Sequence, residues 1–271
     1  MTSTRILKIK HTVVKTALSR SGLPDIDYAL NPYMGCIHGC IYCYARLYTR
    51  DKEASSNWGS VVVVKLNIAS VLERETKRYK PGVVGVGTIT DAYQPIEAKY
   101  KLTRRCIEIL LSRRFKVSIQ TKNPLVLRDL DILSSHRENV DVGFTITTLR
   151  EDVRRMIEPY APPLKARISA IERLSSSGIK TWIFYGPIIP GLNDDEEGVK
   201  DLITLALKTN SLFYYDPIHV KDFMKTPDHP LWRYIVNKPR DWRSRVIKSI
   251  EILCSEYGVK CRPGFTGDST I

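Results

Sequence analysis

Short apolar runs recur along the chain, and their composition predicts β-strands. The runs are rich in β-branched residues, nearly continuous in apolarity and bounded by turn residues. Strands of this kind are typical of a parallel sheet that is covered on both faces. The runs are 61–66, 83–90, 115–121, 140–148, 180–189 and 212–220, and 27–34 is counted as a first strand ahead of them.

Between these runs, apolar residues recur at the spacing of amphipathic helices. Gly178 follows one such segment and is expected to end its helix. The apolar positions are Leu102, Cys106, Ile109 and Leu110; Leu164, Ile168, Ile171 and Leu174; and Trp242, Val246, Ile250, Leu253, Cys254 and Tyr257.

The alternation of strands and helices predicts an α/β fold with right-handed crossovers. We count about six barrel strands and one extra strand, which predicts a partial (β/α)6 TIM-like barrel with its chemistry at the carboxyl ends of the strands. We expect residues 1–26 to form an N-terminal arm, 27–220 the barrel core, and 221–271 a helical C-terminal extension packed on the core.

Composition is that of a folded protein without a membrane span. Of 271 residues 43% are apolar, yet no apolar run approaches the roughly 18 residues that cross a bilayer. The basic start lacks the apolar region of a secretory signal, so we expect a cytoplasmic protein. The net charge of +13 would attract a polyanion such as nucleic acid, although an ordinary solvated surface explains it equally. The cations of the helix expected at 98–114 should face solvent.

Three of the six cysteines fall in one short stretch, "NPYMGCIHGCIYCYAR" (31–46). Cys36, Cys40 and Cys43 could face a single metal centre. A structural zinc site needs four ligands, and only His38, at a cramped spacing, could complete it. A [4Fe–4S] cluster held by three cysteines keeps an open position on one iron, where substrate chemistry takes place. Cys106 and Cys254 lie on apolar helix stripes and are expected in the core, and Cys261 lacks a partner motif.

The chain resembles the radical S-adenosylmethionine (SAM) superfamily, and within it the group related to spore photoproduct lyase. Besides the cysteine loop, the resemblance rests on "GTITDAYQPIE" (87–97), "QTKNPLVLRDLDIL" (120–133), "VGFTITT" (142–148), "EPYAPPLKARISAIERLSSSGI" (158–179) and "GPIIPGLNDDE" (186–196). It implies a barrel of the radical SAM type with a [4Fe–4S] cluster on the three cysteines and SAM on the fourth iron.

The implied reaction is reductive cleavage of SAM to a 5′-deoxyadenosyl radical, which abstracts hydrogen from an unidentified substrate, possibly a nucleic acid. No second cluster motif is present, so an external electron donor of the ferredoxin or flavodoxin type is implied. Two alternatives remain at this stage. The first is a zinc- or Fe–S-binding nucleic-acid-binding module without SAM chemistry, and the second is a simple electron carrier.

The carboxyl ends of the strands supply candidate SAM-binding residues under this resemblance. Thr90 and Asp91 could accept hydrogen bonds from the SAM ammonium group, although Asp91 could equally cap the following turn. Lys122 could pair with the SAM carboxylate, unless it is an ordinary exposed lysine.

Further candidates concern the nucleoside. Thr145 or Thr147 could contact the ribose, Ile188 could form an apolar wall beside the adenine, and Tyr42 could lie against the base. Threonine is also a common strand residue, and Tyr42 could simply pack in the core.

Two tyrosines are catalytic candidates. Tyr44 and Tyr93, with Arg46 nearby, are candidates for substrate contact or radical relay. The segment "TITD" aligns Thr88 with the cysteine that returns hydrogen to the product in spore photoproduct lyase. Because a threonine hydroxyl cannot donate hydrogen in this way, we expect that this protein does not repair spore photoproduct efficiently.

Overall fold

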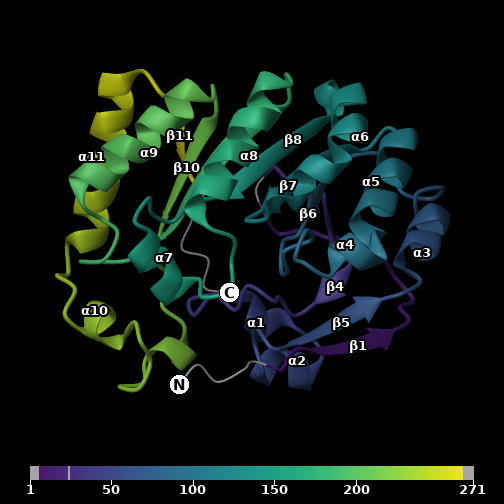
Figure 1. The fold of residues 1–271 in the computed structure, drawn as a ribbon, viewed down its shortest axis with the longest axis horizontal. Coiled ribbons are helices and arrows are strands. Elements are labelled where there is room, and N and C mark those ends of the chain that lie inside the picture. Colours follow the sequence, from purple (N-terminus) through teal and green to yellow (C-terminus); the bar gives the residue numbers. More distant parts are fainter. Residues whose placement is uncertain (1–5, 24, 265–271) are drawn as a thin grey trace.

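The computed structural model describes residues 6–23 and 25–264, and its largest element is an eight-stranded sheet (Figure 1). Its strands are β2 (Leu18–Arg20), β3 (Tyr28–Leu30), β6 (Val83–Val86), β7 (Lys116–Thr121), β8 (Val140–Thr145), β9 (Lys180–Ile188), β10 (Leu212–Pro217) and β11 (Cys261–Pro263). They lie in the order β11-β10-β9-β8-β7-β6-β3-β2, and every pair is parallel except β2 with β3. The six consecutive parallel strands from β3 to β10 confirm the predicted partial barrel.

Helices follow the strands and pack against the sheet (Figure 1). Most residues of their predicted apolar stripes are buried, with Cys106, Ile171 and Ile250 fully inaccessible to solvent, but Tyr257 at the end of α11 is exposed. Gly178 follows α8 with a φ of +75°, as expected just after a helix end. The helices are α1 (Ala45–Tyr48), α2 (Lys52–Ser56), α3 (Ile68–Glu75), α4 (Glu97–Tyr100), α5 (Leu102–Ser112), α6 (Leu130–Ser135), α7 (Glu151–Ile157), α8 (Leu164–Ser176), α9 (Glu196–Lys208), α10 (Trp232–Val236) and α11 (Trp242–Tyr257), with the 3₁₀ turns η1 (Pro124–Asp129), η2 (Arg137–Asn139) and η3 (Asp222–Met224).

The run 27–34 is not one strand, which corrects the prediction. It divides into β3 in the barrel and β4 (Tyr33–Met34) in a separate three-stranded sheet with β5 (Val61–Lys65) and β1 (Lys8–Thr12). Pro32 lies between the two pieces, and proline has no N–H with which to continue a ladder. The run 61–66 is therefore the extra strand, outside the barrel.

The predicted arm and extension both contribute to regular structure. β1 and β2 come from the first 26 residues, and β1 runs parallel to β5. Trp242, Val246 and Ile250 of α11 belong to the same buried core as the barrel strands. The division of the chain into three parts stays a prediction.

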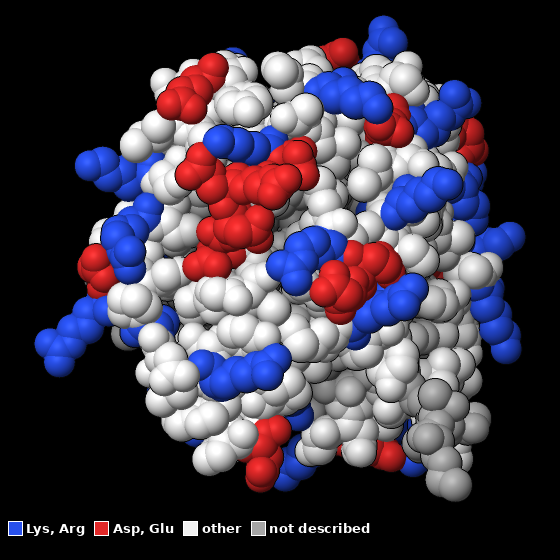
Figure 2. All heavy atoms as spheres, turned by 60° about the vertical axis from the view of Figure 1, so that its left-hand side comes forward, with Lys and Arg blue, Asp and Glu red and all other residues white. Residues whose placement is uncertain are grey.

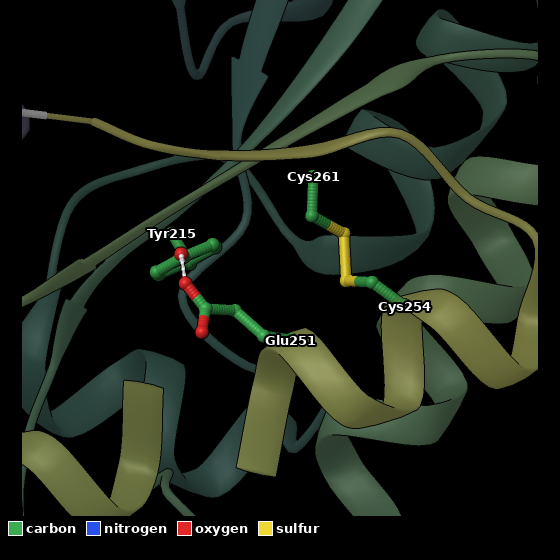
Figure 3. The surroundings of a disulfide bond; sticks show 4 residues. All are labelled: Tyr215, Glu251, Cys254 and Cys261. Atoms are coloured by element: carbon green, nitrogen blue, oxygen red, sulfur yellow. Dashed lines mark hydrogen bonds between the residues drawn. A yellow bond between two sulfur atoms is a disulfide. The ribbon is translucent and has the colours of Figure 1, made fainter. Parts of the chain in front are cut away.

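A disulfide joins Cys254 at the end of α11 to Cys261 in β11 (Figure 3). Cys254 is buried in the core as predicted, but it is also bonded to Cys261, for which the sequence offers no partner motif. β11 pairs with β10, which brings the two Cα atoms to 6.1 Å, a usual disulfide separation. Beside the bond, the Tyr215 hydroxyl donates to Glu251 at 2.7 Å.

None of the helices in residues 6–23 and 25–264 combines the length and apolarity that a membrane crossing requires.

Candidate cofactor site

The cysteine loop, residues 35–43, follows β4 and leads into α1. Cys36 and Cys40 are buried and Cys43 is half-buried. Two backbone turns shape the loop: Gly39 N–H donates to the Cys36 carbonyl at 3.3 Å, and Cys43 N–H donates to the Cys40 carbonyl at 3.2 Å. Burial is the main cause that raises the pKa of Cys36, and the nearby Asp91, Cys40 and Cys43 raise it further.

Residues 157–160, which form the end of α7 and the turn after it, are hydrogen-bonded to the cysteine loop. Ile41 N–H donates to the Ile157 carbonyl at 3.0 Å, and Tyr160 N–H donates to the His38 carbonyl at 3.3 Å. Two backbone bonds therefore fix the loop to a segment more than a hundred residues later in the chain.

A close backbone contact covers the turn between the first two cysteines. Gly39 (φ +59°) and Gly59 (φ +94°) both have left-handed conformations. A Cβ added to Gly59 would lie 2.9 Å from the Gly39 Cα, and one added to Gly39 would lie 3.0 Å from the Tyr160 ring. Only glycine meets both the steric and the conformational requirement at these positions.

Residues 223–229 contact the cysteine loop and the helix α1 that follows it. A ring nitrogen of His229 lies 3.2 Å from the Ile41 carbonyl, and the Arg46 guanidinium lies 4.8 Å from the centre of the Phe223 ring. The C-terminal part of the chain therefore reaches the loop as well.

Asp91 is a buried carboxylate that contacts His38 of the cysteine loop and accepts several hydrogen bonds. Its carboxylate accepts from the Thr121 hydroxyl at 2.7 Å and from the backbone N–H groups of Lys122 (2.8 Å) and Tyr93 (2.9 Å). Its Oδ2 also lies 3.3 Å from His38 Nδ1. Burial raises the pKa of Asp91, but the attraction of His38 and these hydrogen bonds outweigh it and lower the pKa to about 2.

His38 Nε2 is buried and has no hydrogen-bond partner among the described residues. Native proteins rarely leave such an atom unsatisfied, so a group that contacts the cysteine loop is expected here. A histidine that offers one nitrogen to a ligand and the other to a carboxylate is typical of metal sites.

Lys122 reaches the same loop from the end of β7. Its ammonium group lies 5.8 Å from the centre of the Tyr42 ring and 3.9 Å from Glu158 Oε1. Burial lowers the pKa of Lys122, but the neighbouring Cys40 and Glu158 raise it, and the net direction is upward. Lys122 therefore stays charged and is not the ordinary exposed lysine of the alternative interpretation.

Glu158 was not predicted as a site residue. It is completely buried, accepts a short hydrogen bond from the Tyr42 hydroxyl, and forms an ion pair with the equally buried Arg167, whose Nη2 lies 2.6 Å from Oε2. Burial raises the pKa of Glu158, whereas Arg167 and Lys122 lower it, with a net lowering. The only signal in the sequence is the place of Glu158 at the start of the stretch 158–179, and no apolar pattern marks it.

The thiols themselves are strongly affected by burial. Burial raises the pKa of Cys40 to about 12, although the charge of Lys122 opposes the shift. Among the described residues, no three Cys, His, Asp or Glu side chains are already gathered as a metal-binding group. Three thiols on one loop beside a cation and an unsatisfied imidazole are nevertheless a donor set that fits an iron–sulfur centre, because thiolates are its usual ligands.

The other cofactor-binding candidates lie at neighbouring strand ends. The Thr90 hydroxyl donates to the Gly35 carbonyl at 2.6 Å, so it supports the start of the loop. Thr145 accepts from Gln120, and the Thr147 hydroxyl lies 3.4 Å from Glu158. Ile188 ends β9 and is completely buried. The structure therefore brings Thr147 into the Glu158 network, while Thr145 and Ile188 lie at the adjoining ends of β8 and β9.

The two catalytic candidates have different surroundings. Tyr44 is exposed by 36%, and its hydroxyl donates to the Thr88 carbonyl at 2.9 Å. Tyr93 is completely buried, and its hydroxyl donates to Asp129 at 3.0 Å. Burial is the main cause that raises the pKa of each phenol. Tyr44 is thus accessible and Tyr93 is not.

Positive charge is dispersed on the face of the molecule drawn in Figure 2. On the face drawn in Figure 2, Lys and Arg side chains are scattered, and Asp and Glu side chains gather in groups between them. The cations of the segment 98–114 are exposed except Arg104, which is half-buried and binds Asp131 with both terminal nitrogens at 2.9 and 2.8 Å. The expected solvated face is confirmed.

Comparisons with known proteins agree with this geometry. The family model of the radical SAM superfamily matches residues 30–203. A protein of Methanocaldococcus jannaschii is 34% identical over 216 residues, which cover 80% of this chain and 78% of that protein. Spore photoproduct lyase complexed with dinucleoside spore photoproduct has a similar fold, with a TM-score of 0.75, 15% identity, and coverage of 95% of this chain and 82% of that chain. A variant of that enzyme with bound AdoMet and the same dinucleoside gives a TM-score of 0.74 at 16% identity, with coverage of 96% and 82%. This chain therefore belongs to the radical SAM superfamily and is a radical SAM enzyme.

Proposed function

We propose that this enzyme holds a [4Fe–4S] cluster on Cys36, Cys40 and Cys43 and cleaves SAM reductively to start a radical reaction on its substrate. The observation that supports the proposal is the contact of the cysteine loop with two strand ends. Asp91 lies 3.3 Å from His38 of the loop, and the Lys122 ammonium lies over the Tyr42 ring. A buried loop of thiols at the carboxyl edge of a parallel barrel is where cofactor chemistry is expected.

The residues of the chain have distinct parts in this proposal. The three thiolates bind iron, Lys122 pairs with the SAM carboxylate, and the buried surroundings exclude water. When bound and reduced, the cluster supplies the electron that cleaves SAM to methionine and a 5′-deoxyadenosyl radical, which removes a hydrogen atom from the substrate.

The remaining contacts to SAM follow the strand ends. Thr90 and Asp91 would accept from the ammonium group, and Thr145 or Thr147 would contact the ribose. The oxygens of Asp91 already accept three hydrogen bonds, one of them from the Tyr93 N–H two residues on, so the turn-capping alternative also has support.

The adenine would lie between Tyr42 and Ile188. Tyr44 is the better placed of the two catalytic candidates for substrate contact, because part of its ring is exposed.

The test is anaerobic reconstitution of the purified protein with iron and sulfide, followed by addition of SAM and dithionite. We expect a brown protein that absorbs near 400 nm and releases 5′-deoxyadenosine, measured by liquid chromatography. Cys43→Ala is the matched control and should release none. Reconstituted protein that holds iron but leaves SAM intact would contradict the proposal.

A zinc site is the second candidate, because His38 Nε2 is unsatisfied and its other nitrogen faces a carboxylate. Cys36, Cys40, Cys43 and His38 would then complete four ligands. Metal analysis separates the two: one zinc per chain in a colourless protein favours this candidate, and about four irons favour the cluster.

Partners follow from the proposed reaction. An external electron donor of the ferredoxin or flavodoxin type would reduce the cluster. The net charge of +13 supports a nucleic acid or another polyanion as the substrate. Deuterium exchange into candidate substrates, catalysed by the reconstituted enzyme with SAM and dithionite, is the direct screen.

A further inference from the structure

Three of the candidate cofactor residues contact one carboxylate that is not itself a candidate. Glu158 accepts from the Tyr42 hydroxyl, lies within 3.4 Å of the Thr147 hydroxyl and within 3.9 Å of the Lys122 ammonium. These three side chains come from the cysteine loop, from the end of β7 and from the segment after β8. Glu158 therefore connects parts of the site that are far apart in sequence.

Two buried arginines contact Glu158. Its second oxygen faces Arg167 at 2.6 Å, and its own carbonyl accepts from Arg154 at 2.8 Å. Arg167 also donates to the carbonyls of Pro162 (2.9 Å) and Thr145 (3.1 Å). Neither Glu158 nor Arg167 is exposed to solvent at all. Two arginines thus fix both the backbone and the side chain of Glu158.

The Lys122, Arg167 and Glu158 side chains, counted without the thiolates of the cysteine loop, carry one positive charge more than negative. Lys122 and Arg167 contribute two positive charges and Glu158 contributes one negative charge. An anionic group that binds beside Lys122 would neutralise the remaining charge, and a buried ion pair is favourable only with good geometry. The position of the Lys122 ammonium group therefore decides whether this positive charge can pair with the ligand.

We propose that Glu158 is a positioning residue for SAM: together with Arg167 it fixes Lys122, Tyr42 and Thr147 so that the ammonium group of Lys122 is directed at the SAM carboxylate. This inference rests on the proposed function. It assigns to Glu158 no contact with SAM and no part in binding iron. Without its carboxylate, Lys122 and Arg167 would repel each other in a buried site, and Lys122 would move away from the ligand.

The chain offers a matched control. Glu97 is also completely buried, also accepts a short hydrogen bond from a tyrosine, Tyr33, and also pairs with an arginine, Arg128, at 2.8 Å. Glu97 contacts none of the candidate cofactor-binding residues within the described chain. Glu97→Gln thus removes a buried ion pair of the same kind that forms no hydrogen bond or ion pair with Lys122, Tyr42 or Thr147.

The experiment measures SAM affinity by calorimetry on iron-loaded protein without reductant, for wild type, Glu158→Gln, Glu158→Asp and Glu97→Gln. We expect Glu158→Gln to hold as much iron as wild type and to bind SAM about tenfold or more weakly. Glu158→Asp keeps the charge and should recover part of the affinity. Glu97→Gln should unfold at a lower temperature yet bind SAM within about twofold of wild type.

Each contrary outcome has its own meaning. If Glu158→Gln binds SAM as well as or better than wild type, the positioning role is wrong, and so it is if this variant folds but loses its iron. If Glu158→Gln does not fold, Glu158→Asp provides the test, and unchanged affinity in that variant overturns the role. If wild-type protein holds iron but does not bind SAM, the proposed function itself fails, and this inference fails with it.

Discussion

At the scale of single residues, burial disfavours the thiolate forms of the site cysteines, and the nearby Lys122 ammonium favours them. Burial raises the pKa of Cys40, and the Lys122 charge lowers it again. Since the thiolate and not the thiol binds metal, iron must displace the protons of these cysteines. The neighbouring cation and the hydrogen-bonded loop reduce the cost of that exchange.

The three loop cysteines should each be necessary for iron binding. Cys36→Ala, Cys40→Ala and Cys43→Ala are expected to hold less than one iron per chain after reconstitution, because a cluster cannot form on two thiolates. Cys106→Ala is the control: its side chain is buried in α5, so its loss should cost about 1–2 kcal/mol of stability and no iron. A full iron complement in any loop variant would exclude that cysteine as a ligand.

Lys122→Ala should weaken SAM binding and leave the iron content unchanged. Its side chain is 15% exposed and its ammonium group remains charged, so its loss leaves the SAM carboxylate without a partner. Calorimetry should show an affinity lower by about tenfold or more. Lys116→Ala, an exposed lysine at the start of the same strand, is the control. Equal affinities for both variants would remove Lys122 from the SAM site.

Asp91 should make the apoprotein sensitive to acid. Its pKa is lowered to about 2 in the folded state, below its usual value of 3.8. A lowered pKa stabilises the fold above the usual value, and this stability is lost as the pH falls toward the folded value. We expect about 2 kcal/mol to disappear between about pH 4 and 2. Asp91→Asn should flatten the pH dependence of urea unfolding in that range, and an unchanged slope would contradict the assignment.

At the scale of secondary-structure elements, the disulfide fixes the edge of the barrel. β11 is three residues long and extends the sheet beyond β10. A strand this short has few backbone bonds of its own, so the link to α11 through Cys254 and Cys261 is a large part of what holds it (Figure 3).

Breaking this link should destabilise the protein measurably. The two cysteines are 7 residues apart, and closing such a loop is worth about 2–3 kcal/mol. Cys254→Ala should lower the free energy of unfolding by that amount under non-reducing conditions. Wild-type protein should lose the same amount on reduction, whereas the variant should be insensitive to reductant. A wild type that is equally insensitive would mean that the bond does not form in solution.

The elements that could be predicted are those whose pattern is local. The runs that became β6 to β10 are rich in β-branched and aromatic residues, so their composition alone marks them as strands, although burial alternates along β7 and β9. The break at Pro32 was missed because a continuous apolar run conceals a change of sheet. Glu158 and the partner of Cys261 were missed for a different reason: each depends on a contact between segments that no sequence period relates.

At the scale of the whole molecule, all six cysteines now have a place. Three lie in the loop, Cys106 is buried in α5, and Cys254 is bonded to Cys261. Cys106 is the one free thiol outside the loop, and it is completely buried, so it is not accessible to return hydrogen to a product radical. Thr88 aligns with the cysteine that does so in spore photoproduct lyase. Its hydroxyl accepts a hydrogen bond from the Asn31 side chain, and its backbone carbonyl accepts one from the Tyr44 hydroxyl.

We therefore predict that the reconstituted enzyme does not repair spore photoproduct with multiple turnovers. The measurement is thymine release from the dinucleotide photoproduct in the presence of SAM and dithionite, with spore photoproduct lyase as the positive control. Many turnovers by this protein would require a hydrogen donor other than a thiol.

The contact between Gly39 and Gly59 has a consequence for how this family's sequences are interpreted. Both glycines have left-handed backbone conformations. A side chain at Gly59 would collide with the Gly39 backbone, and a side chain at Gly39 would collide with the Tyr160 ring and the Gly59 backbone. Changing a neighbouring side chain does not remove a clash with main-chain atoms, so we expect substitution of either glycine to disturb the cysteine loop. In a saturation library scored for activity, Gly59 would therefore rank with the site residues, although the role the structure gives it is to leave room for the Gly39 backbone.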